Sequence, residues 1–388
     1  MRFNCIFAKP AGRRITRSSV AWYDVTFRQL IDDYFNTGDL TVYDSTLKLL
    51  NYNRSARINI DAPVDRALAS QLNDLYDYVV LRASNYIHEE MEWGYFADWL
   101  DALHLPVLCL GIGAQAATRR RILLPPLANR IWHMIAERSP SIGVRGEFTA
   151  SVLEDNGIRN LDIVGCPSIF RACDPNLQLR HKAFSDIRRV GFSLRRETGD
   201  NYTENVVSFL NTQKELILRF NALFELVLTV HGEIEEKVYY YNDISRLAAA
   251  RQTLRDMGWF DSKNEGELEA VYESRLFFAP VVSYYDDLVR ELDCTLGYRV
   301  HGVLPALAAG TPSVLLRYDE RSAELARTLK VPLLEPDEAL REDVQDLFHP
   351  NRFKEFEENY PKAYEVMRSF LEKHEVAHLM GPPLKLPA

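Results

Sequence analysis

The residues best suited to chemistry lie in one largely apolar stretch, TLGYRVHGVLPALAAGTPSVLLRYDERSAEL. It contains Arg299, His301, Arg317 and Arg321. Guanidinium groups bind carboxylates and phosphates through paired N–H donors, and an imidazole exchanges protons near neutral pH. The stretch therefore predicts a site that holds a small anion beside a proton-transfer residue. The structural alternative is that the arginines pair with nearby carboxylates and that the histidine only caps a helix or packs in the core.

The pattern around these side chains predicts the elements that position them. A strand ends at Tyr298, the junction 299–302 leads into a helix over 303–309, and the strand 313–316 ends in the loop 317–321. In parallel sheets the strand ends and the starts of the following helices share one edge, where ligands bind. The four side chains are therefore expected to face one cleft.

The whole chain of 388 residues alternates short apolar runs with longer helical segments, which is typical of α/β proteins with parallel sheets. The alternation restarts after a polar segment, RACDPNLQLRHKAFSDIRR. We expect an N-terminal Rossmann-like domain over residues 1–180 and a C-terminal one over 181–388 that ends in a helical tail. Two such domains facing each other place the binding site in the cleft between them.

Composition narrows the class of protein. The formal net charge of -9 argues against nucleic acids as partners, because they require a basic surface. The five cysteines are odd in number and none forms a CxxC pair, so we expect reduced thiols and no bound metal. No signal peptide and no apolar span of ~20 residues is present, which predicts a cytoplasmic protein.

Several segments resemble the polysaccharide pyruvyl transferase family. GYRVHGVLPALAAGTPSVLLRYDERS is similar to its C-terminal R-x-H-G, A-x-x-x-G-x-P and Y-D-x-R signature. LGIGAQ, SIGVRGEFTASVLEDNGI and VGCPSIF are similar to its G-x-G, v-R-d-x-x-S and G-C-P-S segments, in the same order. The resemblance implies a GT-B-like fold of two facing Rossmann-like domains. It also implies transfer of the enolpyruvyl group of phosphoenolpyruvate to a sugar diol, giving a pyruvate ketal and phosphate in bacterial exopolysaccharide or cell-surface glycan biosynthesis.

The implied reaction gives the candidate residues their roles. His301 would act as general acid and base. Arg299 and Arg145 would bind the phosphate and the carboxylate of the donor, in either order. Phosphoenolpyruvate would be a co-substrate, with no further cofactor. The other residues expected to bind the donor or shape its site are Arg195, Arg196, Ser283, Gly310, Arg317 and Arg321.

The acceptor, a sugar or a lipid-linked oligosaccharide, is expected to meet the segment ASNYIHEEMEWGYF. Aromatic rings flanked by amides and carboxylates suit sugars, although the aromatics could simply pack in the core. The candidate acceptor residues are Asn85, His88, Glu89, Trp93 and Gln115. The basic segment TRRRILLPPLANRIWHMIAER could contact an anionic membrane surface, but a helix with solvated arginines explains it more simply.

Two positions depart from the family pattern. The Gly-Asn-x-Gly-Asp loop expected after the first strand is missing from AKPAGRRITRSSVAWYD, and NTGD at 36–39 comes late for a substitute. Gly146 stands where the family has an acidic residue, with Glu147 next to it. His231, after another predicted strand, is best explained as a solvated loop histidine.

Two other classes of function remain open at this point. One is a nucleotide-sugar-dependent glycosyltransferase on the same fold, for which Asp319 and Glu320 could grip a ribose. The other is a non-catalytic partner in glycan assembly, against which the intact R-x-H pair argues. The donor that stabilises the protein, phosphoenolpyruvate or a nucleotide sugar, distinguishes the enzymatic alternatives.

Overall fold

The structure, a computed structural model, describes residues 3–8, 14–15, 20–21, 32, 36–196, 199, 203 and 205–382. For residues 3–8, 14–15, 20–21 and 265 it describes the backbone alone. Most of the segment that lacks the glycine-rich family loop, residues 8–24, lies outside the described residues.

A parallel sheet in the order β4-β1-β5-β6 forms the centre of the N-terminal half. Its strands are β1 (Phe3–Ala8), β4 (Tyr52–Ile58), β5 (Tyr78–Leu81) and β6 (Val107–Cys109). A parallel pair, β7 (Ile142–Val144) and β8 (Leu161–Ile163), extends it past β6 through a bridge between Ile112 and Val144. An antiparallel pair is formed by β2 (Arg14–Ile15) and β3 (Val20–Ala21). The helices of this half are α2 (Thr37–Leu49), α3 (Arg66–Leu75), α4 (Phe96–Ala102), α5 (Pro126–Glu137) and α6 (Glu147–Asp155).

The C-terminal half has a six-stranded parallel sheet in the order β11-β10-β9-β12-β13-β14. The strands are β9 (Arg189–Ser193), β10 (Glu225–Val230), β11 (Leu276–Phe278), β12 (Cys294–Gly297), β13 (Ser313–Leu316) and β14 (Leu333–Leu334). Counted within this half, the order is 3-2-1-4-5-6, the Rossmann order, so the chain changes direction across the sheet between β9 and β12. Ligands of such sheets bind at the carboxyl ends of the strands on either side of that point.

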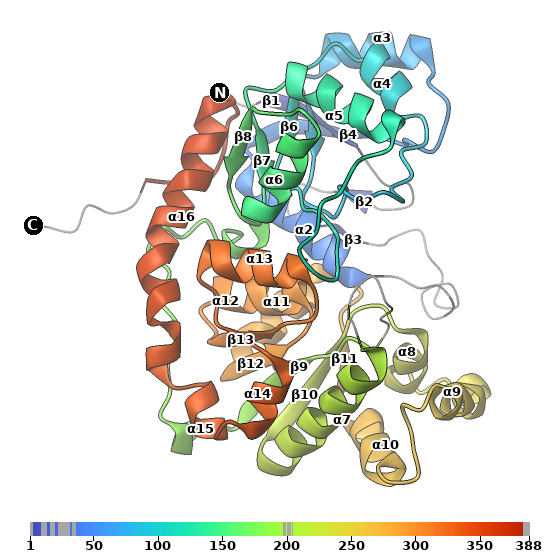
Figure 1. Cartoon of the computed structure of the whole chain (residues 1–388), viewed down its shortest axis with the longest axis vertical. Helices are drawn as coiled ribbons and strands as arrows, with labels where there is room; N and C mark the ends of the chain where they lie inside the picture. The colour runs from blue at the N-terminus through green and yellow to red at the C-terminus, as the bar shows by residue number, and fades with distance from the viewer. Residues whose placement is uncertain are drawn as a thin grey trace, which may run out of the picture.

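Most helices of this half connect its strands. They are α7 (Val206–Leu223), α8 (Ile234–Tyr240), α9 (Ile244–Asp256), α10 (Glu265–Ser274), α11 (Val282–Glu291), α12 (Val300–Ala308), α13 (Glu320–Leu329), α14 (Pro336–Arg341) and α15 (Val344–Leu347). The fold is therefore α/β with two Rossmann-like sheets, as in GT-B proteins, and this confirms the predicted fold class (Figure 1).

The elements of the opening stretch lie close to their predicted bounds. β13 spans Ser313–Leu316 as predicted, whereas α12 starts three residues earlier than expected, at Val300, with Arg299 as its N-cap. The expected loop 317–321 is also shorter, because Asp319 caps α13 and accepts a hydrogen bond from Ser322 N. His301 and Arg321 therefore lie in the first turns of helices.

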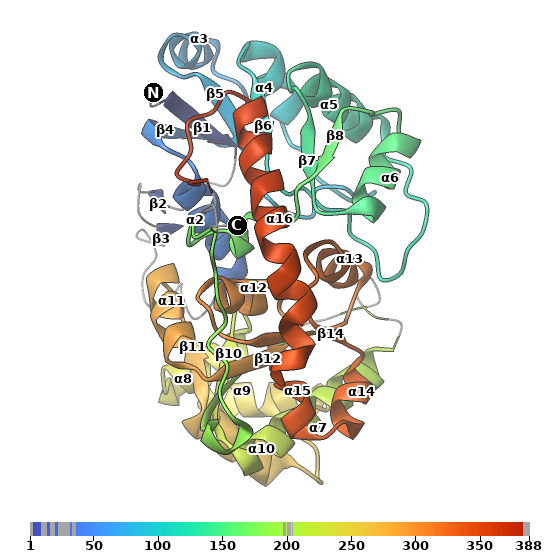
Figure 2. The ribbon, with the colours of Figure 1, turned by 90° about the vertical axis from the view of Figure 1, so that its left-hand side faces the viewer.

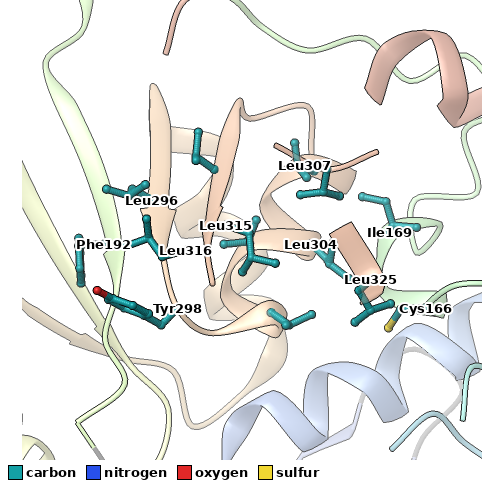
Figure 3. Packing of buried hydrophobic residues seen from close by; sticks show 14 of the residues in the cluster. Cys166, Ile169, Phe192, Leu296, Tyr298, Leu304, Leu307, Leu315, Leu316 and Leu325 are labelled. Atoms are coloured by element: carbon teal, nitrogen blue, oxygen red, sulfur yellow. The ribbon is translucent and has the colours of Figure 1, made fainter. Parts of the chain in front are cut away.

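One apolar cluster includes residues of both halves, and a second cluster lies within the N-terminal half. Figure 3 shows Ile169 and Cys166, from the segment that follows β8, beside Leu304 of α12 and Leu325 of α13. The predicted boundary near residue 180 falls between β8 and β9, in a segment that includes two short 3-10 helices, Pro167–Ile169 and Phe184–Asp186.

Polar contacts also join the halves. Arg171 pairs with Asp44 of α2 and with Asp286 of α11, and Lys48 Nζ lies 2.9 Å from Asp286 Oδ2. Removing one partner of a buried ion pair strongly destabilises a protein, because the other charge is left buried without a counter-charge.

The predicted tail forms a short 3-10 helix, Pro350–Phe353, and then α16 (Lys354–Lys373), which runs along both halves (Figure 2). At its far end, the imidazole of His374 lies 2.8 Å from the carbonyl of Ser141, next to β7. Tyr78 of β5 donates to the carbonyl of His374 at 2.8 Å. The tail, which the sequence assigned to the C-terminal half, is thus also attached to the N-terminal half.

Candidate active site

A pocket of about 670 Å³ opens where the carboxyl ends of the two sheets face each other. The predicted site residues that line it are Asn85, His88, Glu89, Gln115, Arg145, Arg195, Arg299, His301 and Arg321. The structure thus brings nine of the predicted residues, from both halves of the chain, to one cavity.

Five predicted residues lie outside this pocket. Arg196 is buried against Glu236, with Nε 2.7 Å from Oε1, and Arg317 reaches Glu335 at 2.9 Å. Trp93 is 2% exposed, stacks on Phe96 and meets Trp132 edge-on in the core. The remaining two are Ser283, exposed on α11, and Gly310, in the turn that follows α12.

Arg145 follows β7 and is almost completely buried. Its Nε donates to the carbonyl of Gly111 at 3.0 Å and its Nη1 to Oδ1 of Asn85 at 2.8 Å. Its Nη2 has no hydrogen-bond partner among the residues that the structure describes. Because a buried, unpaired N–H group of a cation is costly, this guanidinium is prepared for an anion in the pocket.

The candidate acceptor residues Asn85 and Gln115 form a chain that crosses the pocket wall. Asn85 Nδ2 donates to Gln115 Oε1 at 2.7 Å, and Gln115 Nε2 donates to Asp319 Oδ2 at 3.3 Å. Burial raises the pKa of Asp319 to about 6, although the positive charge of Arg195 acts to lower it. Both amides therefore also connect Arg145 to the C-terminal half.

Arg299 is held by a residue that the sequence did not indicate. Its Nη2 pairs with the buried carboxylate of Glu233, and its Nε donates to the carbonyl of Leu194 at 3.2 Å. Glu233 also accepts hydrogen bonds from the backbone of His231 and Gly232. Burial raises the pKa of Glu233, but the charge of Arg299 outweighs this effect and lowers that pKa to about 2. The carboxylate of Glu233 is therefore ionised.

Two more cations stack on one aromatic ring. The guanidinium carbon of Arg195 lies 4.4 Å from the ring centroid of Tyr318, and that of Arg321 lies 5.5 Å from it. Stacking of this kind fixes the plane of a guanidinium and leaves its edge for hydrogen bonds.

His301 lies in the first turn of α12, and its Nε2 is 4.0 Å from Sγ of Cys166. Burial lowers its pKa well below the ordinary value, and the charges of Arg145 and Arg321 lower it further. Both effects favour the neutral imidazole.

The segment NTGD at 36–39, which comes late in the chain for the glycine-rich family loop, lines the pocket. Asn36 caps α2, its side chain accepts from Gly38 N at 3.0 Å, and Asp39 lies 3.3 Å from Arg82. A Cβ on Gly38 would come within 3.3 Å of the Cβ of His301, so glycine at this position favours the close approach of α2 to His301. The helix after β1 starts at the carboxyl edge of the sheet whatever the length of the preceding loop, so NTGD reaches the pocket although it comes late in the chain.

The prediction that His231 lies in a solvated loop is wrong. It is 2% exposed and lines the pocket directly after β10. Thr37 N donates to its carbonyl at 2.7 Å, because the start of α2 covers the end of β10.

The space beside Gly146 is occupied by side chains of α13, from the other half of the molecule. Glu324 of α13 accepts hydrogen bonds from the backbone N and Oγ1 of Thr149, at 2.6 and 2.8 Å, near the N-terminus of α6. A carboxylate from α13 thus lies beside this turn. Thr149 Oγ1 in turn accepts from Ala114 N at 3.0 Å, which connects Glu324 to the loop that carries Gln115.

Gly146→Ala is expected to destabilise the protein by about 1–3 kcal/mol, a common cost of overpacking. The new Cβ would lie 2.5 Å from both Glu324 Cγ and Thr328 Oγ1. Urea unfolding measures the effect. Gly266→Ala is the matched control, because no atom lies within 4 Å of that Cβ on an exposed helix. Equal stabilities of the two variants would contradict this account of the contact.

The family model for polysaccharide pyruvyl transferases matches residues 28–320. The chain belongs to this family. No curated protein matches it significantly. The matched region of this pyruvyl transferase family member includes Arg145, Arg299 and His301 and ends one residue before Arg321. It also includes NTGD.

Solved structures of similar fold are enzymes of sugar nucleotides and related sugars. A UDP-GlcNAc 2-epimerase from Neisseria meningitidis is 12% identical, with 96% of this chain and 99% of that one covered and a TM-score of 0.46. One from Methanocaldococcus jannaschii is 13% identical over 91% and 94%, with a TM-score of 0.45. A UDP-forming trehalose-phosphate synthase from Burkholderia xenovorans is 11% identical over 97% and 99%, with a TM-score of 0.44.

Proposed function

We propose that this pyruvyl transferase family member moves the enolpyruvyl group of phosphoenolpyruvate to two hydroxyls of a sugar, forming a pyruvate ketal and phosphate. The observation that carries the proposal is the arrangement of Arg145, Arg195, Arg299 and Arg321 around His301 in one interdomain pocket. Phosphoenolpyruvate has a carboxylate and a phosphate, which need cationic partners, and its C3 must be protonated before a hydroxyl attacks C2.

The acceptor side is the mouth of the pocket. Asn85, His88, Glu89 and Glu90 line it, and Arg120 holds Glu89 at 2.7 Å. Amide and carboxylate groups suit sugar hydroxyls, and Glu90 is exposed, whereas Arg145, Arg195 and Arg299 are buried. We therefore assign the mouth to the acceptor and the inner end to the donor.

We further propose that the acceptor is lipid-linked and is used at the cytoplasmic face of the membrane. Leu123 and Leu127 are 58% and 47% exposed, and they lie on the segment that carries the pocket-lining Arg120. In the described part of the chain no helix is long and apolar enough to cross a bilayer. Co-sedimentation with anionic vesicles, and its absence with neutral ones, is the result that this contact requires.

The donor identifies the function. Phosphoenolpyruvate at ~100 times its dissociation constant should stabilise the protein by about 2.7 kcal/mol, and a suitable glycan should then release phosphate and gain a pyruvate ketal. Both are measurable, by thermal unfolding and by mass spectrometry of the product. Stabilisation by a nucleotide sugar and none by phosphoenolpyruvate would instead identify a glycosyltransferase.

Donor binding is expected to take up a proton. His301 is neutral in the empty pocket, because burial and the charges of Arg145 and Arg321 lower its pKa. A bound trianion offsets those charges and raises that pKa, so the complex holds a proton that the free protein lacks. Affinity for phosphoenolpyruvate should therefore fall as the pH rises through the pKa of the complex.

Titration calorimetry in two buffers of different ionisation enthalpy measures that uptake. His301→Asn should remove it. An affinity independent of pH near neutrality, with equal heats in both buffers, would show that the histidine does not change its protonation on binding.

A further inference from the structure

The proposed roles of Arg145, Arg299 and His301 leave His231 without a function, yet it lines the same pocket. Thr37, in the first turn of α2, holds one side of its ring, with Oγ1 3.2 Å from Nδ1. The ring of Tyr285 lies edge-on to it, with the centroids 5.6 Å apart. The imidazole is thus oriented by contacts from two elements.

The second ring nitrogen is unsatisfied. Nε2 of His231 has no hydrogen-bond partner in the described part of the chain. Gly302, next to His301, approaches the ring closely, because a Cβ there would lie 3.3 Å from Nε2 and 2.5 Å from Ser193 Oγ. Leaving a buried polar atom unpaired is costly, so a partner from a bound molecule would be favoured.

The charges around this ring keep it neutral. Burial lowers the pKa of His231 to about 3, the charge of Arg299 lowers it too, and Glu233 opposes them. A neutral imidazole is the form that accepts a proton. An anionic donor bound beside Arg299 would offset that positive charge and make the ring a stronger base.

The proposed reaction needs more than one base. Each of the two acceptor hydroxyls loses a proton when its oxygen bonds to C2 of the donor. His301 gives its proton to C3, and it can then accept only one of these two protons. The other proton must pass to a second acceptor, which is either the phosphate oxygen itself or another side chain beside the hydroxyls.

We propose that His231 is this second proton-transfer residue, an inference that rests on the proposed function. In the first step the His301 imidazolium protonates C3, the first hydroxyl oxygen bonds to C2, and its proton passes to His231 Nε2. In the second step the other hydroxyl oxygen bonds to C2 and gives its proton to His301. The bond from C2 to the phosphate oxygen breaks, and phosphate leaves with the electron pair and takes the proton from His231. The trianionic donor and the neutral diol thus become a monoanionic ketal and dianionic hydrogen phosphate, with both histidines restored.

Two substitutions in the full-length protein separate proton transfer from hydrogen bonding. His231→Asn keeps an amide near Nδ1 for Thr37, and His231→Gln keeps an amide near Nε2, but neither amide accepts a proton. Both should lower kcat for ketal formation at least ~10²-fold, the lower end of what a positioned acid or base contributes. Stabilisation by phosphoenolpyruvate should stay at the wild-type level. His104→Gln, on the surface, is the matched control.

Several outcomes would overturn the role of His231. Wild-type kcat in His231→Gln would mean that Nε2 only donates or accepts a hydrogen bond. Loss of stabilisation by phosphoenolpyruvate in parallel with kcat would mean that the residue holds the donor site together. If His231→Asn fails to fold, as judged by circular dichroism, His231→Gln alone decides. A wild-type protein inert toward phosphoenolpyruvate would reject the proposed function itself, a result distinct from the other two.

Discussion

Replacement of His301 by asparagine is expected to lower kcat for ketal formation by about 10²–10⁴-fold, the range that a positioned acid or base contributes. His301 lies at the inner end of the pocket, in the first turn of α12. Its pKa responds to the charges of Arg145 and Arg321, so it lies within electrostatic reach of any anion that they bind. Asparagine retains a polar group near Nδ1 but cannot carry the proton to C3.

Stabilisation by phosphoenolpyruvate should persist in His301→Asn, because the arginines supply the charge that holds the donor. His133→Asn is a suitable control, since His133 contacts the carbonyl of Asn156 at 3.2 Å on α5, away from the pocket. Retention of wild-type kcat by His301→Asn would remove this residue from the chemistry. Loss of donor stabilisation with little change in kcat would make it a binding residue instead.

The sequence predicted most of the sheet strands because they are short, continuous apolar runs, whereas β4, with the sequence YNRSARI, lacks that pattern and was not predicted. β13 lies at its predicted bounds, and α12 differs only at its start. The early start has a physical reason. Arg299 has extended backbone angles, φ -80° and ψ 113°, and the helix begins at the next residue, Val300.

The sequence pattern could not decide which of the two adjacent arginines after β9, Arg195 or Arg196, faces the pocket. Arg195 stacks on Tyr318 in the pocket, whereas Arg196 turns to Glu235 and Glu236 of α8. Successive side chains of an extended segment point in opposite directions, so only one of the pair could face the donor. The choice depends on which face carries the carboxylates, and those follow a different strand, β10.

The residues that the sequence missed belong to contacts between distant segments. His231 is covered by Thr37, 194 positions away, and a solvated loop was the reasonable expectation without that contact. Glu233 follows two residues later, and its partner Arg299 is 66 positions away. Local patterns place side chains at the edge of a sheet, but the segment from the other half that covers them is set by the tertiary fold.

Arg145→Lys is expected to weaken binding of phosphoenolpyruvate at least ~10-fold and up to ~150-fold, the equivalent of about 1.5–3 kcal/mol for a hydrogen bond to a charged group. The guanidinium uses Nε and Nη1 for Gly111 and Asn85, which leaves Nη2 for the donor. Lysine keeps the charge but has a single nitrogen, so it cannot hold both contacts and the donor in one plane. The effect should appear in the dissociation constant and in KM for phosphoenolpyruvate.

The control for Arg145→Lys must separate lost binding from lost stability, because Arg145 is 1% exposed. Arg138→Lys serves this purpose, since Arg138 also donates to backbone carbonyls, those of Leu100 and Leu103, but does not line the pocket. Both variants should lose some stability to urea, and only Arg145→Lys should lose affinity for phosphoenolpyruvate. Equal affinities would mean that the anion binds to the arginines of the C-terminal half alone, with Arg145 acting only to join Asn85 to the Gly111 loop. The split between affinity and stability therefore decides whether the N-terminal half holds the donor or only closes over it.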